Sequence, residues 1–131
     1  MSFKIEIVSP VKVVYEGEVN SVTVPGSEGS FQVLKNHAPL ISAFSIGEIK
    51  IETESGIIEF STGGGVFEVK NNKAIVLADS IESKEEIDLE RARRAKERAE
   101  EILKMTKPTQ HEKEDAKLAL QRAINRIKLK R

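Results

Sequence analysis

Hydrophobic residues follow two different periods along this chain, and the change falls near residue 83. Before that point they alternate with polar residues, as in Phe3 and Ile5, which is the period of a half-buried strand. After it they recur three and four residues apart, as in Ala92, Ala95 and Ala99, which is the period of one helix face. The pattern predicts a β domain over residues 1–82 and a helical hairpin over residues 83–131.

The first part of the chain is predicted to be a set of short strands. Strand-like runs are separated by turn residues, among them Pro25-Gly26, Ser55-Gly56 and Asn71-Asn72. The runs cover residues 3–8, 11–15, 19–24, 30–33, 46–52, 57–61, 66–69 and 74–77. Many short strands at regular spacing are typical of an antiparallel β sandwich or a flattened barrel.

Capping signals and a proline divide the second part into two helices. Residues 83–86 and residues 109–112 each have the sequence of a capping box, and Pro108 follows a first helix that should end near Met105. The short connection predicts antiparallel neighbours. Their facing stripes are rich in alanine, which buries little apolar area. The hairpin should therefore be marginally stable by itself, and the alternatives are a permanently packed hairpin and one that opens or extends.

Charge divides at the same place as the hydrophobic pattern. Residues 1–83 contain six lysines, no arginine and eleven acidic residues, whereas residues 84–131 contain eight lysines, seven arginines and ten acidic residues. The formal net charge of +0 hides this division. An acidic scaffold with a cationic helical tail suggests a fixed part that carries a mobile or ligand-responsive part.

Composition and the start of the chain exclude several classes. The chain has no cysteine, so it forms no disulfide and uses no thiol chemistry. Met1-Ser2-Phe3 leads directly into a strand pattern, so we expect no signal peptide. Apolar runs fall far below the ~20 residues that a spanning helix needs. We expect any membrane association to depend on a partner.

Catalytic signals are weak. His37 and His111 have no third type of metal ligand clustered near them in sequence, which argues against a zinc site. The glycines at residues 63–65 precede a strand and not a helix, so they predict a tight turn or a close backbone approach and not a phosphate loop. We expect a chain that is not an enzyme and has no catalytic residue and no metal ligand.

One loop region is more specific. Glu28 lies between two glycines, and a short strand then leads to His37 in the sequence NHAPL. His37 is expected either to bond to its own loop backbone or to contribute to a partner surface.

Three segments of the first part and two of the second resemble the ε subunit of bacterial F-type ATP synthases. They are EGSFQVLKNHAPL at residues 28–40, GGGVFEV at 63–69, NNKAIVLAD at 71–79, IDLERA at 87–92 and ALQRAINR at 119–126. The similarity extends over nearly the whole chain. It implies a β sandwich of about ten antiparallel strands, followed by a C-terminal antiparallel helical hairpin.

The resemblance also implies a function. In this family the sandwich binds the γ subunit and the c-subunit ring, and the helices inhibit ATP hydrolysis when they extend toward the α and β subunits of the catalytic head. The partner contacts implied for this chain are Glu28, Ser30 and His37; Ser30 stands where some relatives have a glutamate that faces the c ring. The resemblance implies a peripheral location on the cytoplasmic face of the bacterial plasma membrane, where the chain is held only through the complex. It implies no nucleic-acid partner.

The segment at residues 87–92 resembles the ATP-binding motif of ε subunits that sense ATP. No cofactor is required, but ATP is implied as a regulatory ligand. The implied ligand-binding residues are Glu82, Ile87, Asp88, Arg91, Ala92, Arg98, Arg122 and Arg126. Asp115 departs from the pattern, because some relatives have an arginine there and a carboxylate repels phosphate. The arginines are alternatively expected to pair with Glu90, Glu97 and Glu101.

Two other classes remain open. A free-standing ATP-sensing module would use the arginines without a rotor, and a structural adaptor would need no ligand. Co-purification with γ and the catalytic subunits would distinguish both from a synthase subunit.

Overall fold

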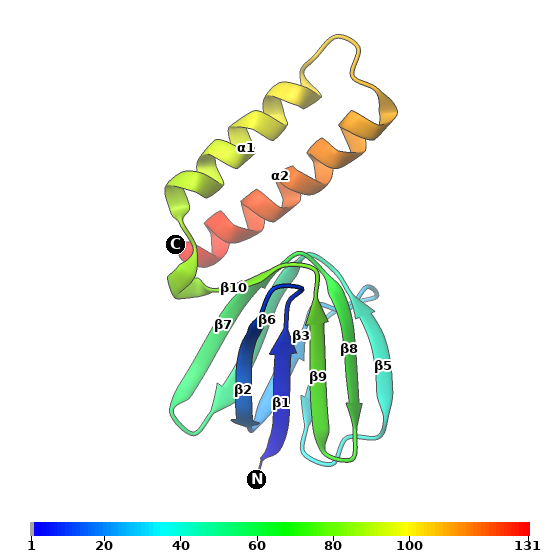
Figure 1. Cartoon of the computed structure of the whole chain (residues 1–131), viewed down its shortest axis with the longest axis vertical. Helices are drawn as coiled ribbons and strands as arrows, with labels where there is room; N and C mark the ends of the chain where they lie inside the picture. The colour runs from blue at the N-terminus through cyan, green and yellow to red at the C-terminus, as the bar shows by residue number, and fades with distance from the viewer. Residues whose placement is uncertain (1) are drawn as a thin grey trace. The chain divides into compact units, whose positions relative to one another are not determined.

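A computed structural model describes residues 2–131. The chain forms two compact units, one that extends to Ser83 and a second that comprises Lys84–Arg131 (Figure 1). The first unit contains all the strands and the second contains both α-helices.

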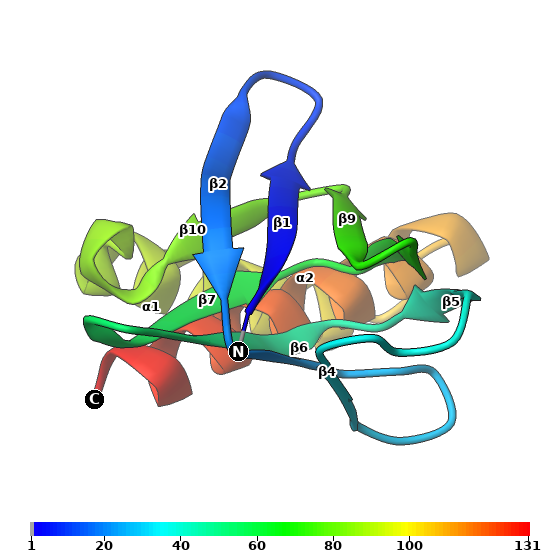
Figure 2. The ribbon, with the colours of Figure 1, turned by 90° about the horizontal axis from the view of Figure 1, so that it is seen from below.

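The first unit is a sandwich of two five-stranded sheets, which confirms the expected fold class. Sheet A contains, in spatial order, β2 (Val13–Val19), β1 (Phe3–Val8), β9 (Lys73–Ala78), β8 (Gly65–Lys70) and β5 (Leu40–Phe44). Sheet B contains β10 (Ile81–Ser83), β7 (Gly56–Thr62), β6 (Gly47–Thr53), β3 (Ser21–Val24) and β4 (Phe31–Leu34). Figure 2 shows the layers from below, with β1 and β9 on one side of β6.

One strand pair departs from the expected antiparallel pattern. β1 and β9 run parallel, with Ile5 opposite Ala74 and Ile7 opposite Val76. They lie side by side at the centre of sheet A, although most of the sandwich separates them in sequence. Parallel neighbours require a long crossover connection, and here strands β2 to β8 provide it.

Several strand predictions were wrong. The run expected to end at residue 15 continues through Gly17, because Gly17 pairs with Ile5 while Glu16 and Glu18 face outward. Strands β5 and β10 were not predicted from the local pattern. Both are edge strands whose pairing with β8 and β7 decides their conformation.

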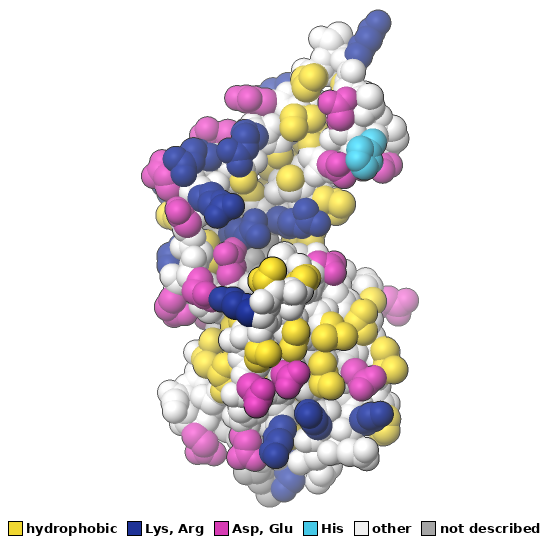
Figure 3. Space-filling model, in the orientation of Figure 1, with side chains coloured by type: hydrophobic (Ala, Val, Ile, Leu, Met, Phe, Trp, Pro, Cys, Tyr) yellow, Lys and Arg dark blue, Asp and Glu magenta, His cyan; other side chains and the backbone are white. Residues whose placement is uncertain are grey.

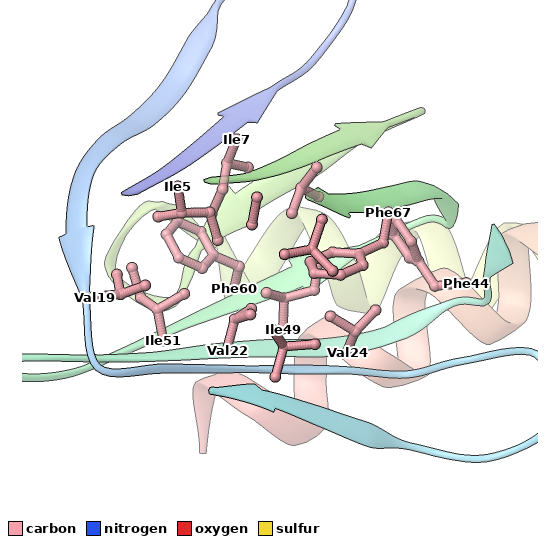
Figure 4. Close-up of a cluster of buried hydrophobic side chains, with 14 of the residues drawn as sticks. Ile5, Ile7, Val19, Val22, Val24, Phe44, Ile49, Ile51, Phe60 and Phe67 are labelled. Atoms are coloured by element: carbon pink, nitrogen blue, oxygen red, sulfur yellow. The ribbon is translucent and has the colours of Figure 1, made fainter. Parts of the chain in front are cut away.

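Apolar side chains from both sheets meet in one core. Figure 4 shows Ile5 and Ile7 from sheet A directed toward Val22, Ile49 and Phe60 from sheet B. These side chains are at most 2% exposed, which is the burial that their alternation in sequence predicts.

Two aromatic rings join the sheets near one edge of this core. Phe31 of β4 and Phe67 of β8 meet edge to face, with ring centroids 5.7 Å apart and an interplanar angle of 71°. This is a favourable aromatic geometry that adds to the burial of both rings.

The turn between β8 and β9 also fixes neighbouring segments. Asn71 and Asn72 have φ angles of 51° and 59°, a left-handed conformation that asparagine tolerates. The Oδ1 atom of Asn72 accepts a hydrogen bond from the Asn36 backbone N–H at 2.8 Å, and its Nδ2 donates to the carbonyl of Ser2 at 3.3 Å. The loop that contains His37 is therefore anchored to this turn.

The second unit is a helical hairpin. It begins with the short 3-10 helix η1 (Lys84–Glu86), continues with α1 (Leu89–Leu103) and ends with α2 (Gln110–Lys130). Alanines dominate the buried positions, as predicted: Ala92 and Ala99 on α1, Ala116 and Ala123 on α2.

Of the two predicted capping boxes, the one at residues 109–112 is confirmed. The Thr109 hydroxyl accepts from the backbone N–H of Glu112, and the Glu112 carboxylate accepts from the backbone N–H of Thr109, each at 3.0 Å. Ser83 ends strand β10, where it pairs with Phe60, and it directly precedes η1 and not α1. Asp88 caps α1 by accepting from the Arg91 N–H at 3.1 Å.

Candidate functional site

The outer face of sheet A carries a row of apolar side chains across all five strands. Cross-strand pairing aligns Ala43 with Val66, Val66 with Leu77, Leu77 with Val8, and Val8 with Val13. Val13 is 55% exposed, Leu77 53% and Val66 43%. We call these five residues the apolar row. A contiguous exposed apolar strip of this kind marks an interaction surface in a soluble protein.

Two rows that contain charged residues lie beside the apolar row on the same face. The nearer one contains Ile41, Glu68, Ile75, Glu6 and Glu16. The farther one contains Lys70, Lys73, Lys4 and Glu18. Figure 3 shows this order on the sandwich, with hydrophobic, then acidic, then basic side chains. The face therefore presents an apolar strip with a defined charged border, which can fix the orientation of a partner.

The apolar row was not predicted from the sequence, although one signal was available. Residues 74–78 read AIVLA, so β9 is apolar at outward as well as inward positions. A continuous apolar run is typical of a strand that is covered on both faces. Ala74, Val76 and Ala78 are buried in the core, but Leu77 is exposed.

The predicted partner contacts lie at two ends of β5 and do not form one site. Glu28 lines a shallow pocket with Gly26, Ile41 and Ala43, and so lies beside the end of the apolar row. His37 precedes the other end of β5, in the loop that is anchored to Asn72. β5 is five residues long, so its two ends lie roughly 13 Å apart.

His37 and Ser30 are both exposed. The Nδ1 atom of His37 lies 2.6 Å from the carbonyl oxygen of Ala38, so the tautomer with a proton on Nδ1 donates to this oxygen. This is the local backbone bond that was one of the two alternatives expected for His37. It leaves Nε2 available to a partner.

The predicted ATP residues differ in accessibility. Asp88 is exposed, but one of its carboxylate oxygens already caps α1. Ile87 and Ala92 are 4% and 3% exposed, so their side chains present little surface to a ligand. Glu82 lies on β10, opposite Ser61.

The arginines lie on both helices of the hairpin. Arg91 and Arg98 are exposed on α1, whereas Arg122 and Arg126 are half-buried on α2. Figure 3 shows that Lys and Arg side chains gather on one face of the hairpin. Such a face favours an anionic ligand or an acidic protein surface.

A groove between the two helices contains one of these arginines. It has a volume of about 360 Å³ and is lined by Arg98, by the alanines Ala95, Ala99, Ala116 and Ala119, and by Ile102, Glu112 and Asp115. Asp115 also lies 3.2 Å from the Nε2 atom of His111. The carboxylates of Glu112 and Asp115 make this groove unfavourable for a phosphate. Arg98 therefore lies near negative charge and not among cations alone.

Within residues 2–131, no group of three or more Asp, Glu or His side chains is arranged to hold a metal ion. Neither helix in this range is long and apolar enough to cross a membrane.

Comparison with known proteins agrees with the two units of the fold. The family described as "ATP synthase, Delta/Epsilon chain, beta-sandwich domain" matches residues 2–84, and the family described as "ATP synthase, Delta/Epsilon chain, long alpha-helix domain" matches residues 85–130. This chain therefore belongs to the ATP synthase delta/epsilon chain family.

Individual relatives support the same assignment. The chain is 40% identical over 125 residues to the ATP synthase epsilon chain of Desulforamulus reducens. The aligned region covers 95% of this chain and 94% of the relative. It is 43% identical over 129 residues to the ATP synthase epsilon chain of Desulfitobacterium hafniense strain Y51, with 96% and 94% covered. The resemblance to bacterial ε subunits is confirmed.

Solved structures share the fold at low sequence identity. A chain of the Euglena gracilis mitochondrial ATP synthase superposes with a TM-score of 0.79 at 20% identity, covering 92% of this chain and 76% of that one. A chain from the central stalk and c ring of the Tetrahymena thermophila mitochondrial ATP synthase superposes with a TM-score of 0.65 at 18% sequence identity. This match covers 98% of this chain and 96% of that one.

Proposed function

We propose that this chain is a non-catalytic subunit of the central stalk of a bacterial F-type ATP synthase, and that the apolar row is the surface by which it binds the γ subunit. Family membership supports the assignment to the synthase. The observation that carries the binding surface is the alignment of five outward apolar residues across sheet A. Burial of these residues against γ would supply a hydrophobic contact, and the charged border would set its register.

A charge introduced into the apolar row tests this surface. Leu77→Lys should weaken co-purification of the chain with γ, because the ammonium group would be desolvated at the interface. Leu34→Lys is a matched control, since Leu34 is 54% exposed on β4 of sheet B and Leu77 is 53% exposed. Equal binding of both variants to γ would exclude the apolar row as the docking surface.

The remaining contacts of the sandwich are proposed from the family resemblance. Glu28 and Ser30 would face the c-subunit ring, and His37 would present its Nε2 to the rotor from the opposite end of β5. The chain would then be peripheral at the cytoplasmic face of the plasma membrane, held there by the complex.

The hairpin is proposed to regulate the enzyme. Four of the six buried residues on α1 and α2 are alanines, which bury less apolar area than larger side chains, so separation of the helices would cost less free energy than in a leucine-rich hairpin. The cationic face of the hairpin would contact acidic surface on the α and β subunits and inhibit ATP hydrolysis. ATP bound through the predicted arginines would hold the hairpin closed.

A free-standing ATP-sensing module is the second candidate. The gathering of Lys and Arg side chains on the hairpin favours it, since an anionic ligand could bind there without a rotor (Figure 3). Recovery of the chain without γ from cells that contain both would support this candidate over the first.

A further inference from the structure

The last residue of α2 contacts the first turn of the hairpin. The Nζ atom of Lys130 donates to the carbonyl oxygen of Lys84 at 3.0 Å and to that of Glu85 at 3.2 Å. The two partners precede Lys130 by 46 and 45 residues, and all three residues belong to the second unit. One ammonium group thus joins the beginning and the end of the hairpin.

The surroundings of this contact favour a cation. The carbonyls of η1 present partial negative charge, and the side chains of Glu85 and Glu86 belong to the same short helix. Lys130 is half-buried, so its bonds to the two carbonyls are less screened than those of an exposed lysine. Hydrogen bonds from a charged donor are stronger than those between neutral groups.

The position of the contact gives it a role in opening. The loop after Leu103 ties α1 to α2 at one end, so the helices can separate only from the other end. The Lys130 contact lies at that other end. The other buried residues of the two helices are four alanines, which contribute little apolar burial, and Ile127 and Leu129, which lie at the same end of α2 as Lys130.

We propose that Lys130 is a latch that holds the hairpin closed, and that loss of its bonds to η1 is the first step in the separation of α2 from α1. The latch is a property of the chain itself. Only its consequence for ATP hydrolysis rests on the proposed function.

Distance measurements between the helices test the latch. The chain has no cysteine, so Glu90→Cys with Gln121→Cys gives two unique, exposed positions for spin labels on α1 and α2. In this background Lys130→Met should raise the ratio of open to closed hairpin by about tenfold, the change expected when a hydrogen bond to a charged group is lost. Lys128→Met is the control. Lys128 is exposed on the same turn of α2, and its replacement by methionine removes the same charge.

Further variants separate the latch from other effects. Lys130→Arg should keep most of the closed population, because it retains a cationic donor. Unchanged urea unfolding of the sandwich would verify that Lys130→Met folds. Identical distance distributions for the parent and Lys130→Met, or equal opening by Lys130→Met and Lys128→Met, would overturn the proposal. Opening of Lys130→Met without a change in ATP hydrolysis by the assembled enzyme would leave the latch intact and contradict the proposed inhibition instead.

Discussion

Gly65 lies where β8 approaches β9 so closely that a side chain has no room. A Cβ atom built at Gly65 would lie 2.0 Å from the carbonyl oxygen of Leu77 and 2.9 Å from the Cα atom of Ala78. Both are backbone atoms of β9, so no side-chain rotation can relieve the contact. The close backbone approach, one of the two alternatives predicted for residues 63–65, is confirmed at Gly65.

Gly65→Ala should therefore destabilise the sandwich by about 2 kcal/mol or more, as overpacking of a well-packed region does. Urea unfolding followed by the β signal measures this. Gly17→Ala is the control, because its Cβ would meet only the Tyr15 side chain, with the hydroxyl at 3.2 Å. We expect a change below about 1 kcal/mol there. A similar loss in the two variants would show that the close approach is not what requires glycine at residue 65.

Glu112 has a lowered pKa because the Thr109 backbone N–H, and then the Thr109 hydroxyl, bond to its side chain. Since the pKa is lower in the folded chain, the ionised Glu112 carboxylate contributes its full stabilisation to the capping box above the ordinary carboxyl pKa. That contribution disappears as the pH falls through the lower folded value.

The amide proton of Thr109, followed by NMR as the pH decreases, should report this titration. Its midpoint should lie below that of an ordinary exposed glutamate, and the response should vanish in Glu112→Gln. Glu101→Gln, an exposed position on α1, should leave the response intact. A midpoint at or above the ordinary value would contradict the capping geometry.

At the scale of elements, the helix caps explain how the hairpin joins the sandwich. Ser83 pairs in β10 and Asp88 caps α1, so η1 and Ile87 form the connection between the last strand and the first helix. The carboxylate of Asp88 is therefore part of the helix terminus. A ligand at this position would have to share Asp88 with the Arg91 N–H.

Binding of ATP is an element-scale prediction, because it involves residues of both helices. Calorimetry on the full chain should detect heat at millimolar ATP, and Arg91→Ala combined with Arg126→Ala should abolish it. A ligand that binds only the closed hairpin stabilises it by about 2.7 kcal/mol at a hundredfold excess over Kd. Asp115→Asn should tighten binding, because it removes a carboxylate from the groove that contains Arg98.

Arg93→Ala combined with Arg94→Ala is the matched control for charge, since both residues are exposed on α1 outside the predicted set. If the Arg93/Arg94 double variant weakens ATP binding as much as the Arg91/Arg126 double variant, ATP is attracted to the positive charge of the hairpin in general and not to a specific site. The absence of heat at millimolar ATP would exclude the sensor role and leave the arginines as surface charges.

At the scale of the whole molecule, the sandwich has a core of its own. Every fully buried residue of that core lies between Phe3 and Ala78, and the strands end at Ser83. Folding of the first unit should therefore not require the hairpin.

A chain that ends at Ser83 should retain a cooperative unfolding transition with a β signal. It should still bind γ, because the apolar row is complete, but the assembled enzyme should hydrolyse ATP faster than with the full chain. Urea unfolding and ATPase assays measure the two effects. Loss of cooperative unfolding would show that the sandwich depends on the hairpin; an unchanged ATPase rate would argue against inhibition by the helices.

Local signals in the sequence were sufficient for much of the architecture. The change of hydrophobic period near residue 83, the capping box that begins at Thr109 and the turn at Asn71-Asn72 each depend on residues close together in the chain. Such signals act through backbone conformation and side chains within a few residues, so they can be read without knowledge of the fold.

Tertiary structure alone decided which distant residues meet. Pairing with Phe60 extended the last strand to Ser83, and parallel pairing placed Leu77 beside Val8 in the apolar row. Lys130 met the carbonyls of η1 only because the hairpin closes. Strand register and helix pairing are set by packing between segments far apart in sequence, so a local pattern carries no information about them.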